Sequence, residues 1–212
     1  MSSDGPHRDP VDLLGAGPGA GELAGLQDEL AGLQDRLAVA AEDEGLLDVA
    51  FRTLDTPLGA VLLAATPAGL VRLAFEREGF DAVLDDLAGR IGPRVLRAPR
   101  PLDQAARQVQ DYLLGHRTRF DLALDLRLAN GFRRSVLAWL PNIGYGRTAS
   151  YQAVAAAAGS PKAARAVGTA CATNPLPIVI PCHRVVRGDG RLGGYLAGPA
   201  VKQRLLDLEA RR

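Results

Sequence analysis

Residues 177–186 of this 212-residue chain read PIVIPCHRVV and place a cysteine, Cys182, between a proline and a histidine. The apolar run before the cysteine is typical of a buried strand. The chain has only two cysteines, too few for a disulfide framework, so both are expected to be free thiols. Cys182 is therefore either a reactive nucleophile or a small buried packing residue.

A reactive cysteine needs a neighbour that stabilises or generates its thiolate, because the pKa of a free thiol is about 8.5. His183 and Arg184 follow Cys182 directly and could supply a base and a positive charge. Adjacent side chains of a strand point to opposite faces, so direct contact between Cys182 and His183 is not assured and a water could bridge them. The short motif alone leaves both interpretations open.

Basic residues gather in the C-terminal part of the chain. Residues 131–212 carry 12 Lys and Arg against three acidic residues, whereas residues 1–130 carry 13 against 21. This asymmetry indicates either a surface for a polyanion or an uneven solvated surface. The chain shows no zinc-ligand spacing, no apolar run long enough for a membrane and no secretory signal pattern, so we expect a cytoplasmic protein without a metal.

Two short helices joined by a glycine-containing turn are predicted over residues 150–171. Ser150 fits the N-cap of the first helix, and Ser160 followed by Pro161 fits the start of the second. This pattern is typical of a helix-turn-helix. The second helix has small side chains around a single Arg165, so it could approach DNA closely without reading bases. An alanine-rich core helix is the alternative.

The preceding residues predict an α+β unit. Short apolar runs over residues 48–75, separated by Pro and Gly turns, predict a small antiparallel sheet. Residues 80–91 and 102–115 have helical spacing, and residues 119–128 alternate like one more strand. A further helix is predicted over residues 132–140.

A leucine-rich segment lies before this unit. The sequence LAGLQDE is followed by LAGLQDR, and the leucines at 23, 26, 30, 33 and 37 recur at spacings of three and four. This pattern predicts an amphipathic helix, although Gly25 and Gly32 each weaken it by about 1 kcal/mol relative to alanine. The helix either packs on its own domain or serves as a linker, or it forms a short dimerising coil. Residues 1–21 are rich in Gly, Pro and Asp and are expected to be disordered.

The sequence on both sides of Cys182 carries a more specific pattern. SPKAARAVGTACATN ends at Asn174, NPLPIVIPCHRVV follows from the same residue, and GGYLAGPAVKQRLLDLE ends at Glu209. These stretches resemble the O6-alkylguanine-DNA alkyltransferase family. The resemblance runs from about residue 132 to Glu209 and extends more loosely back to about residue 49.

The resemblance implies an α+β protein with two domains. A ribonuclease H-like α/β domain with a small antiparallel sheet, residues 47–128, would precede a helical, winged-helix-like helix-turn-helix DNA-binding domain, residues 129–212. The disordered leader and leucine-repeat helix, residues 1–46, lie outside the resemblance. The implied partner is duplex DNA containing O6-alkylguanine, with O4-alkylthymine left open as a second substrate. We expect a monomer, with weak self-association through the Leu23–Leu37 helix left open.

The resemblance also implies the reaction and its catalytic residues. The damaged guanine is flipped out of the duplex, and its alkyl group moves irreversibly to Cys182 in a single turnover without a cofactor. His183 would act as a base through a water, and Glu209 would orient His183. Asn174 would hold the active-site loop, and Tyr151 would donate a proton to the leaving purine.

The remaining implied residues contact DNA or line the base pocket. Arg165 would fill the place of the extruded base. The other DNA-binding residues would be Tyr151, Ser150, Lys162, Ala164 and Gly168. The pocket residues would be Pro177, Val185, Tyr195, Leu196 and the supporting cation Lys202. Cys171 is expected to be a packing residue.

Three other functions compete with this interpretation. A DNA-binding regulator without chemistry should show base-reading side chains on the second helix, and the presence of Cys182 argues against it. A cysteine hydrolase would need oxyanion donors and a cleft for an acyl substrate, and the sequence shows no pattern that indicates either. A structural protein with a buried cysteine would react slowly with thiol reagents.

Overall fold

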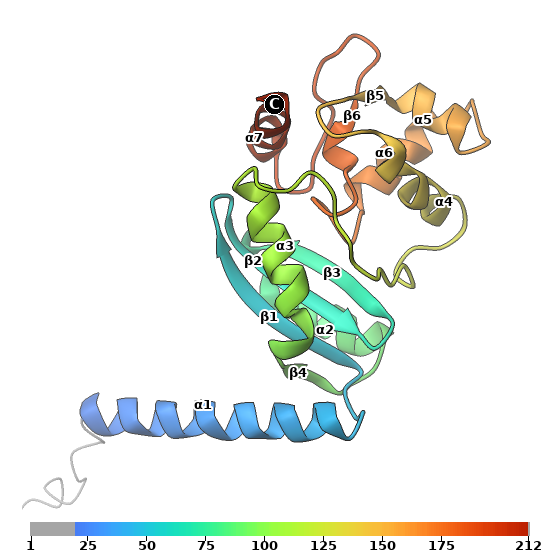
Figure 1. Ribbon diagram of the computed structural model, residues 1–212. Coiled ribbons are helices and arrows are strands. Elements are labelled where there is room, and N and C mark those ends of the chain that lie inside the picture. Colours follow the sequence, from blue (N-terminus) through green and yellow to red (C-terminus); the bar gives the residue numbers. More distant parts are fainter. Residues whose placement is uncertain (1–19, 212) are drawn as a thin grey trace, which may run out of the picture.

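A four-stranded sheet forms the first part of the computed structural model, which describes residues 20–211 (Figure 1). Strands β1 (Val49–Thr56), β2 (Gly59–Thr66) and β3 (Gly69–Phe75) form an antiparallel meander. Strand β4 (Val95–Arg97) pairs in parallel with β1, giving the order β3-β2-β1-β4. The predicted antiparallel meander is confirmed. Strand β4 was not predicted, and its parallel pairing with β1 makes the sheet mixed.

Helices cover both faces of this sheet, as side-chain alternation along a strand requires. On one face, α2 (Phe80–Arg90) packs on Leu62 and Ala64 of β2. On the other, α3 (Asp103–Leu113) packs in the core that contains Leu63 and Leu73. Both helices were predicted close to these bounds. Short 3-10 turns, η2 (Glu76–Glu78) and η3 (Arg100–Leu102), connect these elements.

The strand predicted over residues 119–128 is wrong. This segment runs along β3, but it forms only one bridge, between Leu70 and Leu124. The Leu70 amide donates to the Ala123 carbonyl at 2.9 Å, and the Asp125 amide donates to the Leu70 carbonyl at 2.8 Å. The close approach depends on Gly69, because a Cβ there would lie 2.4 Å from the Ala123 oxygen.

Helix α1 (Ala20–Asp43) confirms the predicted leucine-rich helix. It contacts β4 at its C-terminal end, where Ala38 and Ala41 are buried. Figure 1 shows the rest of the helix extending away from the sheet. Its leucines are exposed, so the docked-helix interpretation holds only for the last turns. The leader predicted to be disordered lies almost entirely outside the described residues.

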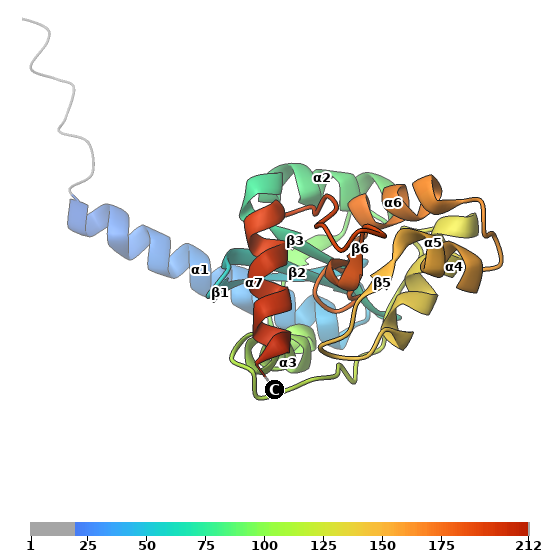
Figure 2. The same ribbon diagram turned by 90° about the horizontal axis from the view of Figure 1, so that it is seen from above.

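The C-terminal part is helical. It begins with α4 (Gly131–Trp139), which was predicted, and the turn η4 (Leu140–Asn142). Helices α5 (Tyr151–Ala157) and α6 (Ala164–Ala172) form the helix-turn-helix, and α7 (Pro199–Ala210) ends the described chain. A two-stranded parallel pair, β5 (Ala149–Ser150) and β6 (Val185–Val186), lies between α7 and helices α4–α6 (Figure 2). Residues 49–126 are called the sheet unit below, and residues 131–210 the helical unit.

The two predicted helix starts had different outcomes. The hydroxyl of Ser150 accepts a hydrogen bond from the Ala153 amide at 3.1 Å, so Ser150 is the N-cap of α5. The predicted start of the second helix at Ser160 and Pro161 is wrong. The Ala163 amide donates to the Ser160 carbonyl at 2.9 Å, which closes a separate turn, and α6 begins only afterwards.

The buried strand predicted before Cys182 is also wrong. Residues 175–180 form turns and bends, and Ile178 has a φ of 73°. Cys182 itself begins the 3-10 turn η5 (Cys182–Arg184). An apolar run indicates burial of either a strand or a loop, and its periodicity does not distinguish the two. The strand-based argument about Cys182 and His183 therefore does not apply.

The loop that precedes Cys182 rests on the sheet unit. The Leu73 amide of β3 donates to the Pro175 carbonyl at 2.8 Å, and the Arg72 side chain donates to the same oxygen at 3.4 Å. One hydrophobic core runs through both units and includes Leu73 and Ile180. Within residues 20–211, no helix has the length and apolar character needed to cross a membrane.

Candidate active site

Cys182 is held by Asn174 from the end of the α6 segment. Both residues are buried, with 1% and 0% of their surfaces exposed. The Asn174 amide nitrogen Nδ2 lies 3.1 Å from the Cys182 Sγ and 3.0 Å from the Ile180 carbonyl. Its Oδ1 accepts a hydrogen bond from the Leu176 amide at 3.0 Å. Asn174 therefore fixes the conformation of the loop and places its amide donor against the Cys182 sulfur.

The resting state of Cys182 is a neutral thiol. Burial raises the pKa of this thiol to about 11, although the hydrogen bond from Asn174 and the charge of Lys202 both oppose the rise. Lys202 is itself fully buried, and its Nζ donates to the Val185 carbonyl at 2.5 Å. Burial lowers the pKa of Lys202, whereas proximity to Cys182 and Cys171 raises it. The site can stabilise a thiolate, but forming one needs a base.

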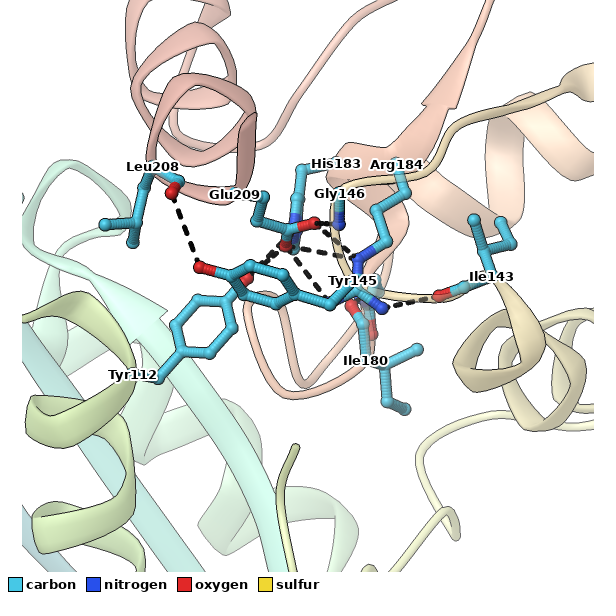
Figure 3. Close-up of polar contacts among 10 residues, drawn as sticks. Tyr112, Ile143, Tyr145, Gly146, Ile180, His183, Arg184, Leu208 and Glu209 are labelled. Atoms are coloured by element: carbon cyan, nitrogen blue, oxygen red, sulfur yellow. Dashed lines mark hydrogen bonds and ion pairs between the residues drawn. The ribbon is translucent and has the colours of Figure 1, made fainter. Parts of the chain in front are cut away.

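Glu209 of α7 collects hydrogen bonds from both units (Figure 3). His183 Nε2 lies 2.7 Å from Glu209 Oε1, and the Gly146 amide donates to Oε2 at 2.9 Å. The Tyr112 hydroxyl, from α3 of the sheet unit, also donates to Oε1. Arg184 Nε lies 3.0 Å from Oε2, and Arg184 donates through another nitrogen to the Ile143 carbonyl at 2.5 Å.

These donors keep the Glu209 carboxylate ionised although it is buried. Burial alone would raise its pKa, but hydrogen bonds from His183, Arg184 and Tyr112 outweigh this effect and lower the pKa to about 2. The charge of Arg184 is thus paired with the Glu209 carboxylate. The expectation that Arg184 could act directly on the neighbouring thiol is not supported by this arrangement.

His183 has the protonation that a general base requires. Burial lowers its pKa, so the imidazole is neutral at neutral pH. Because ionised Glu209 can only accept, the ring proton is assigned to Nε2, and Nδ1 keeps its lone pair. Nδ1 is buried and has no hydrogen-bond partner within residues 20–211. It can therefore accept a proton.

Tyr151 packs against the segment between β6 and α7. An added Cβ at Gly193 would lie 2.0 Å from the Tyr151 hydroxyl, so only glycine at residue 193 leaves room for this ring. Burial raises the pKa of Tyr151, and the nearby Cys171 and Cys182 raise it further. The Tyr151 hydroxyl is therefore neutral and half-buried, and it is able to donate a hydrogen bond or a proton.

The residues expected to line the base pocket come from several elements. Tyr195 packs edge-on against His183, with ring centroids 6.4 Å apart, and against Phe75 of the sheet unit at 6.2 Å. Pro177 and Val185 are buried in the loop and in β6. Leu196 lines a cavity of about 420 Å³ between α2 and the end of α6, which Asn174 also borders.

The surface of the helix-turn-helix matches its sequence pattern. Arg165 is exposed on α6, and Lys162 is exposed in the turn before it. Ala164 and Gly168 are half-buried on the same helix. The opposite side of α6 packs inward through Val167, Ala170 and Cys171. Cys171 is buried, and burial raises its pKa, as expected for a packing residue.

Comparison with known proteins identifies the family. Residues 49–126 match the family model "6-O-methylguanine DNA methyltransferase, ribonuclease-like domain", and residues 131–211 match "6-O-methylguanine DNA methyltransferase, DNA binding domain". The chain belongs to the 6-O-methylguanine DNA methyltransferase family. Helix α1 lies outside both matched ranges.

Individual members of the methyltransferase family agree with this. The methylated-DNA–protein-cysteine methyltransferase of Mycolicibacterium paratuberculosis is 40% identical over 77% of this chain and 93% of that protein. The bifunctional transcriptional activator/DNA repair enzyme Ada of Escherichia coli is 41% identical over 77% of this chain but only 46% of that protein. A crystal structure of Mycobacterium tuberculosis OGT in complex with DNA matches with a TM-score of 0.67 and 37% identity, covering 76% of this chain and 92% of that one.

In this methyltransferase-family chain, sequence reasoning missed the residues that support the site from a distance. Tyr112 was read only as part of a helix, since nothing in its local sequence indicates contact with Glu209. Ile143 and Gly146 contribute backbone groups, which leave no side-chain signal. Gly193 was part of a quoted motif, but its contact with Tyr151 appears only in three dimensions.

Proposed function

We propose that this chain repairs DNA by moving an alkyl group from O6 of guanine to the Sγ of Cys182. The observation that carries the proposal is the buried set of Cys182, His183 and Glu209, in which the residue after the neutral thiol is a histidine that contacts Glu209 and has a second, unpartnered ring nitrogen. Membership of the methyltransferase family supports the same reaction. No oxyanion hole is required, because the reaction is a displacement at a carbon atom of the alkyl group.

The first step makes the nucleophile. His183 Nδ1 takes the thiol proton of Cys182 through a bridging water, and Glu209 stabilises the imidazolium that forms. Asn174 Nδ2 then donates to the thiolate, at the 3.1 Å separation already present. The charge of buried Lys202 stabilises the same anion. The high resting pKa of Cys182 means that this proton transfer is part of the reaction and not of the resting state.

The second step transfers the alkyl group. The thiolate attacks the alkyl carbon, a carbon–sulfur bond forms, and the bond between that carbon and guanine O6 breaks. The Tyr151 hydroxyl gives a proton to the purine as it leaves, which restores neutral guanine. The thioether is stable, and no group in the site can remove it, so each molecule reacts once.

The DNA contact uses the helix-turn-helix. A target base must leave the stack to reach a buried cysteine, which costs a few kcal/mol. The exposed Arg165 fills the gap from the minor-groove side, and the small residues Ala164 and Gly168 let α6 lie close to the DNA. Lys162 and the segment at Ser150 contact phosphates, which gives sequence-tolerant binding.

The proposed organisation follows the same logic. Residues 47–128 form the ribonuclease-like domain and residues 129–212 the DNA-binding domain, a division that the two matched ranges support. One chain carries every residue of the reaction, so a monomer is sufficient for repair. The need for a reduced Cys182 and for access to DNA supports a cytoplasmic location.

A duplex with O6-methylguanine inside a restriction site tests the proposal, because removal of the methyl group restores cleavage. Each molecule of the wild-type protein should restore cleavage of one duplex. Cys182→Ala should restore none while still binding the duplex, because the thiol does not contact phosphates. Full restoration by Cys182→Ala would exclude Cys182 as the acceptor.

A further inference from the structure

The exposed leucines of α1 have no role in the proposed repair reaction. Leu23, Leu26, Leu30, Leu33 and Leu37 are 46%, 54%, 55%, 50% and 57% exposed. They form one apolar stripe, because spacings of three and four keep residues on the same side of a helix. A row of large apolar side chains in solvent is a mark of an interaction surface.

Among the described side chains of α1, the buried ones lie at its C-terminal end. Ala38 and Ala41 are buried, whereas Leu37, the last leucine of the stripe, remains exposed. Ala38 lies about 100° around the helix axis from Leu37 and Ala41 about 40° from it, yet Leu37 itself stays 57% exposed. Burial of the two alanines thus leaves the stripe free. A projecting helix without tertiary packing is marginal in water, so a partner on this stripe would stabilise it.

The occupant that fits this stripe is a second copy of the same helix. The leucines occupy the a and d positions of a heptad repeat, the arrangement by which helices pack on each other. Glu29 and Arg36 lie seven residues apart at the flanking g position, and both are exposed. We propose that α1 pairs with α1 of a second copy in antiparallel orientation, an interaction that goes beyond the repair function.

Charge selects the antiparallel orientation. When Leu30 packs against Leu33 of the partner subunit, Glu29 faces Arg36 of the partner subunit, and the two-fold axis repeats this pair. A slip of seven residues would place Arg36 against the partner's Arg36 or Glu29 against the partner's Glu29. Opposite charges therefore coincide with a register in which Leu26 and Leu30 pack against Leu37 and Leu33 of the partner subunit.

A parallel pair fits less well. In that orientation a g residue faces the e residue of the following heptad on the other helix. Arg36 would then face Ala41 of the partner subunit, and Glu29 would face the partner's Gln34, so neither charge would find an opposite charge. Moreover, Ala41 is already buried against its own sheet unit. Antiparallel pairing instead carries the two repair units to opposite ends of the coil.

Sedimentation of the full chain over a wide concentration range tests the pairing. The wild type should pass reversibly from monomer to dimer. The double variant Leu30→Lys with Leu33→Lys should remain monomeric and should transfer alkyl groups at the wild-type rate, because these leucines lie outside the repair site. A wild type that is monomeric throughout, or a double variant that dimerises equally, would overturn the proposal.

Charge variants test the orientation. Glu29→Arg and Arg36→Glu should each weaken self-association by roughly tenfold, since each places like charges opposite one another twice. Mixed together, the two variants should form a heterodimer at least as tight as the wild-type dimer. Glu44→Arg, the same charge change beyond the end of α1, is the control and should have little effect. If the mixture associates no better than each variant alone, the antiparallel arrangement is wrong.

Discussion

The side-chain amide of Asn174 donates to the sulfur of Cys182 over 3.1 Å and to the Ile180 carbonyl over 3.0 Å. One residue thus fixes the shape of the loop and presents a donor to the sulfur. The same sulfur carries a proton at rest, because burial holds the pKa of Cys182 at about 11. The thiolate can exist only where such donors and a nearby cation compensate for lost water.

Replacing Asn174 should slow alkyl transfer. Asn174→Asp keeps the shape of the side chain but exchanges the donor for a carboxylate, which raises the pKa of Cys182 further. We expect a rate reduced by about tenfold or more, the cost of losing a hydrogen bond to a charged group. The rate of methyl transfer measured against pH checks this. Asn142→Asp, at an exposed asparagine that donates to the Trp139 carbonyl, is the control, and equal rates for both variants would contradict the assignment.

Acid stability should depend on Glu209. In the folded protein its pKa is lowered from 4.5 to about 2, so its stabilising effect is full above pH 4.5 and is lost as the pH falls toward 2. Glu209→Gln should reduce stability at neutral pH by about 3 kcal/mol, because Arg184 keeps a buried charge without its partner. The variant should also lose less stability than the wild type between pH 4.5 and about 2. Urea unfolding at several pH values gives both quantities, and parallel pH curves would refute the linkage.

Arg165→Ala should separate base flipping from chemistry. Duplex repair should slow by about tenfold or more, because the variant cannot fill the gap left by the extruded base. Reaction with a free O6-alkylguanine base should stay near the wild-type rate. Single-turnover rates on both substrates check this, with Arg134→Ala, at another exposed arginine of the helical unit, as the control. Equal losses on the two substrates would remove Arg165 from the flipping step.

Gly193 and Gly194 offer a matched pair of variants. A Cβ at Gly193 would lie 2.0 Å from the Tyr151 hydroxyl, whereas a Cβ at Gly194 would meet nothing within 4 Å. Gly193→Ala should displace Tyr151 and slow transfer by about tenfold, while Gly194→Ala should be close to wild type. Transfer rates with matched thermal unfolding curves distinguish a shifted donor from a damaged fold. Similar rates for the two variants would mean that the position of Tyr151 does not matter.

Much of the site could be anticipated because its chemical groups lie close together in the sequence. Asn174, Cys182 and His183 fall within ten residues, and a specific pattern surrounds them. Tyr112 could not be anticipated, because it reaches Glu209 only through packing of the sheet unit against α7. Nothing in the sequence around Tyr112 indicates its contact with Glu209.

The errors in secondary structure have physical causes. The apolar run before Cys182 indicated burial correctly, but the Asn174 hydrogen bonds bend it into turns instead of a strand. Ser160 and Pro161 have the composition of a helix start, yet the Ala163 amide closes a turn with Ser160 before α6 begins. In both places a tertiary or turn hydrogen bond outweighed a local preference.

The most direct test of alkyl transfer to Cys182 is the intact mass of the protein after incubation with a duplex that carries one O6-methylguanine, followed by peptide mapping. We expect one added methyl group per chain, located on Cys182, with no further increase when more duplex is added. An unchanged mass with the duplex still bound would contradict the proposed reaction and would leave a protein that recognises DNA without repairing it.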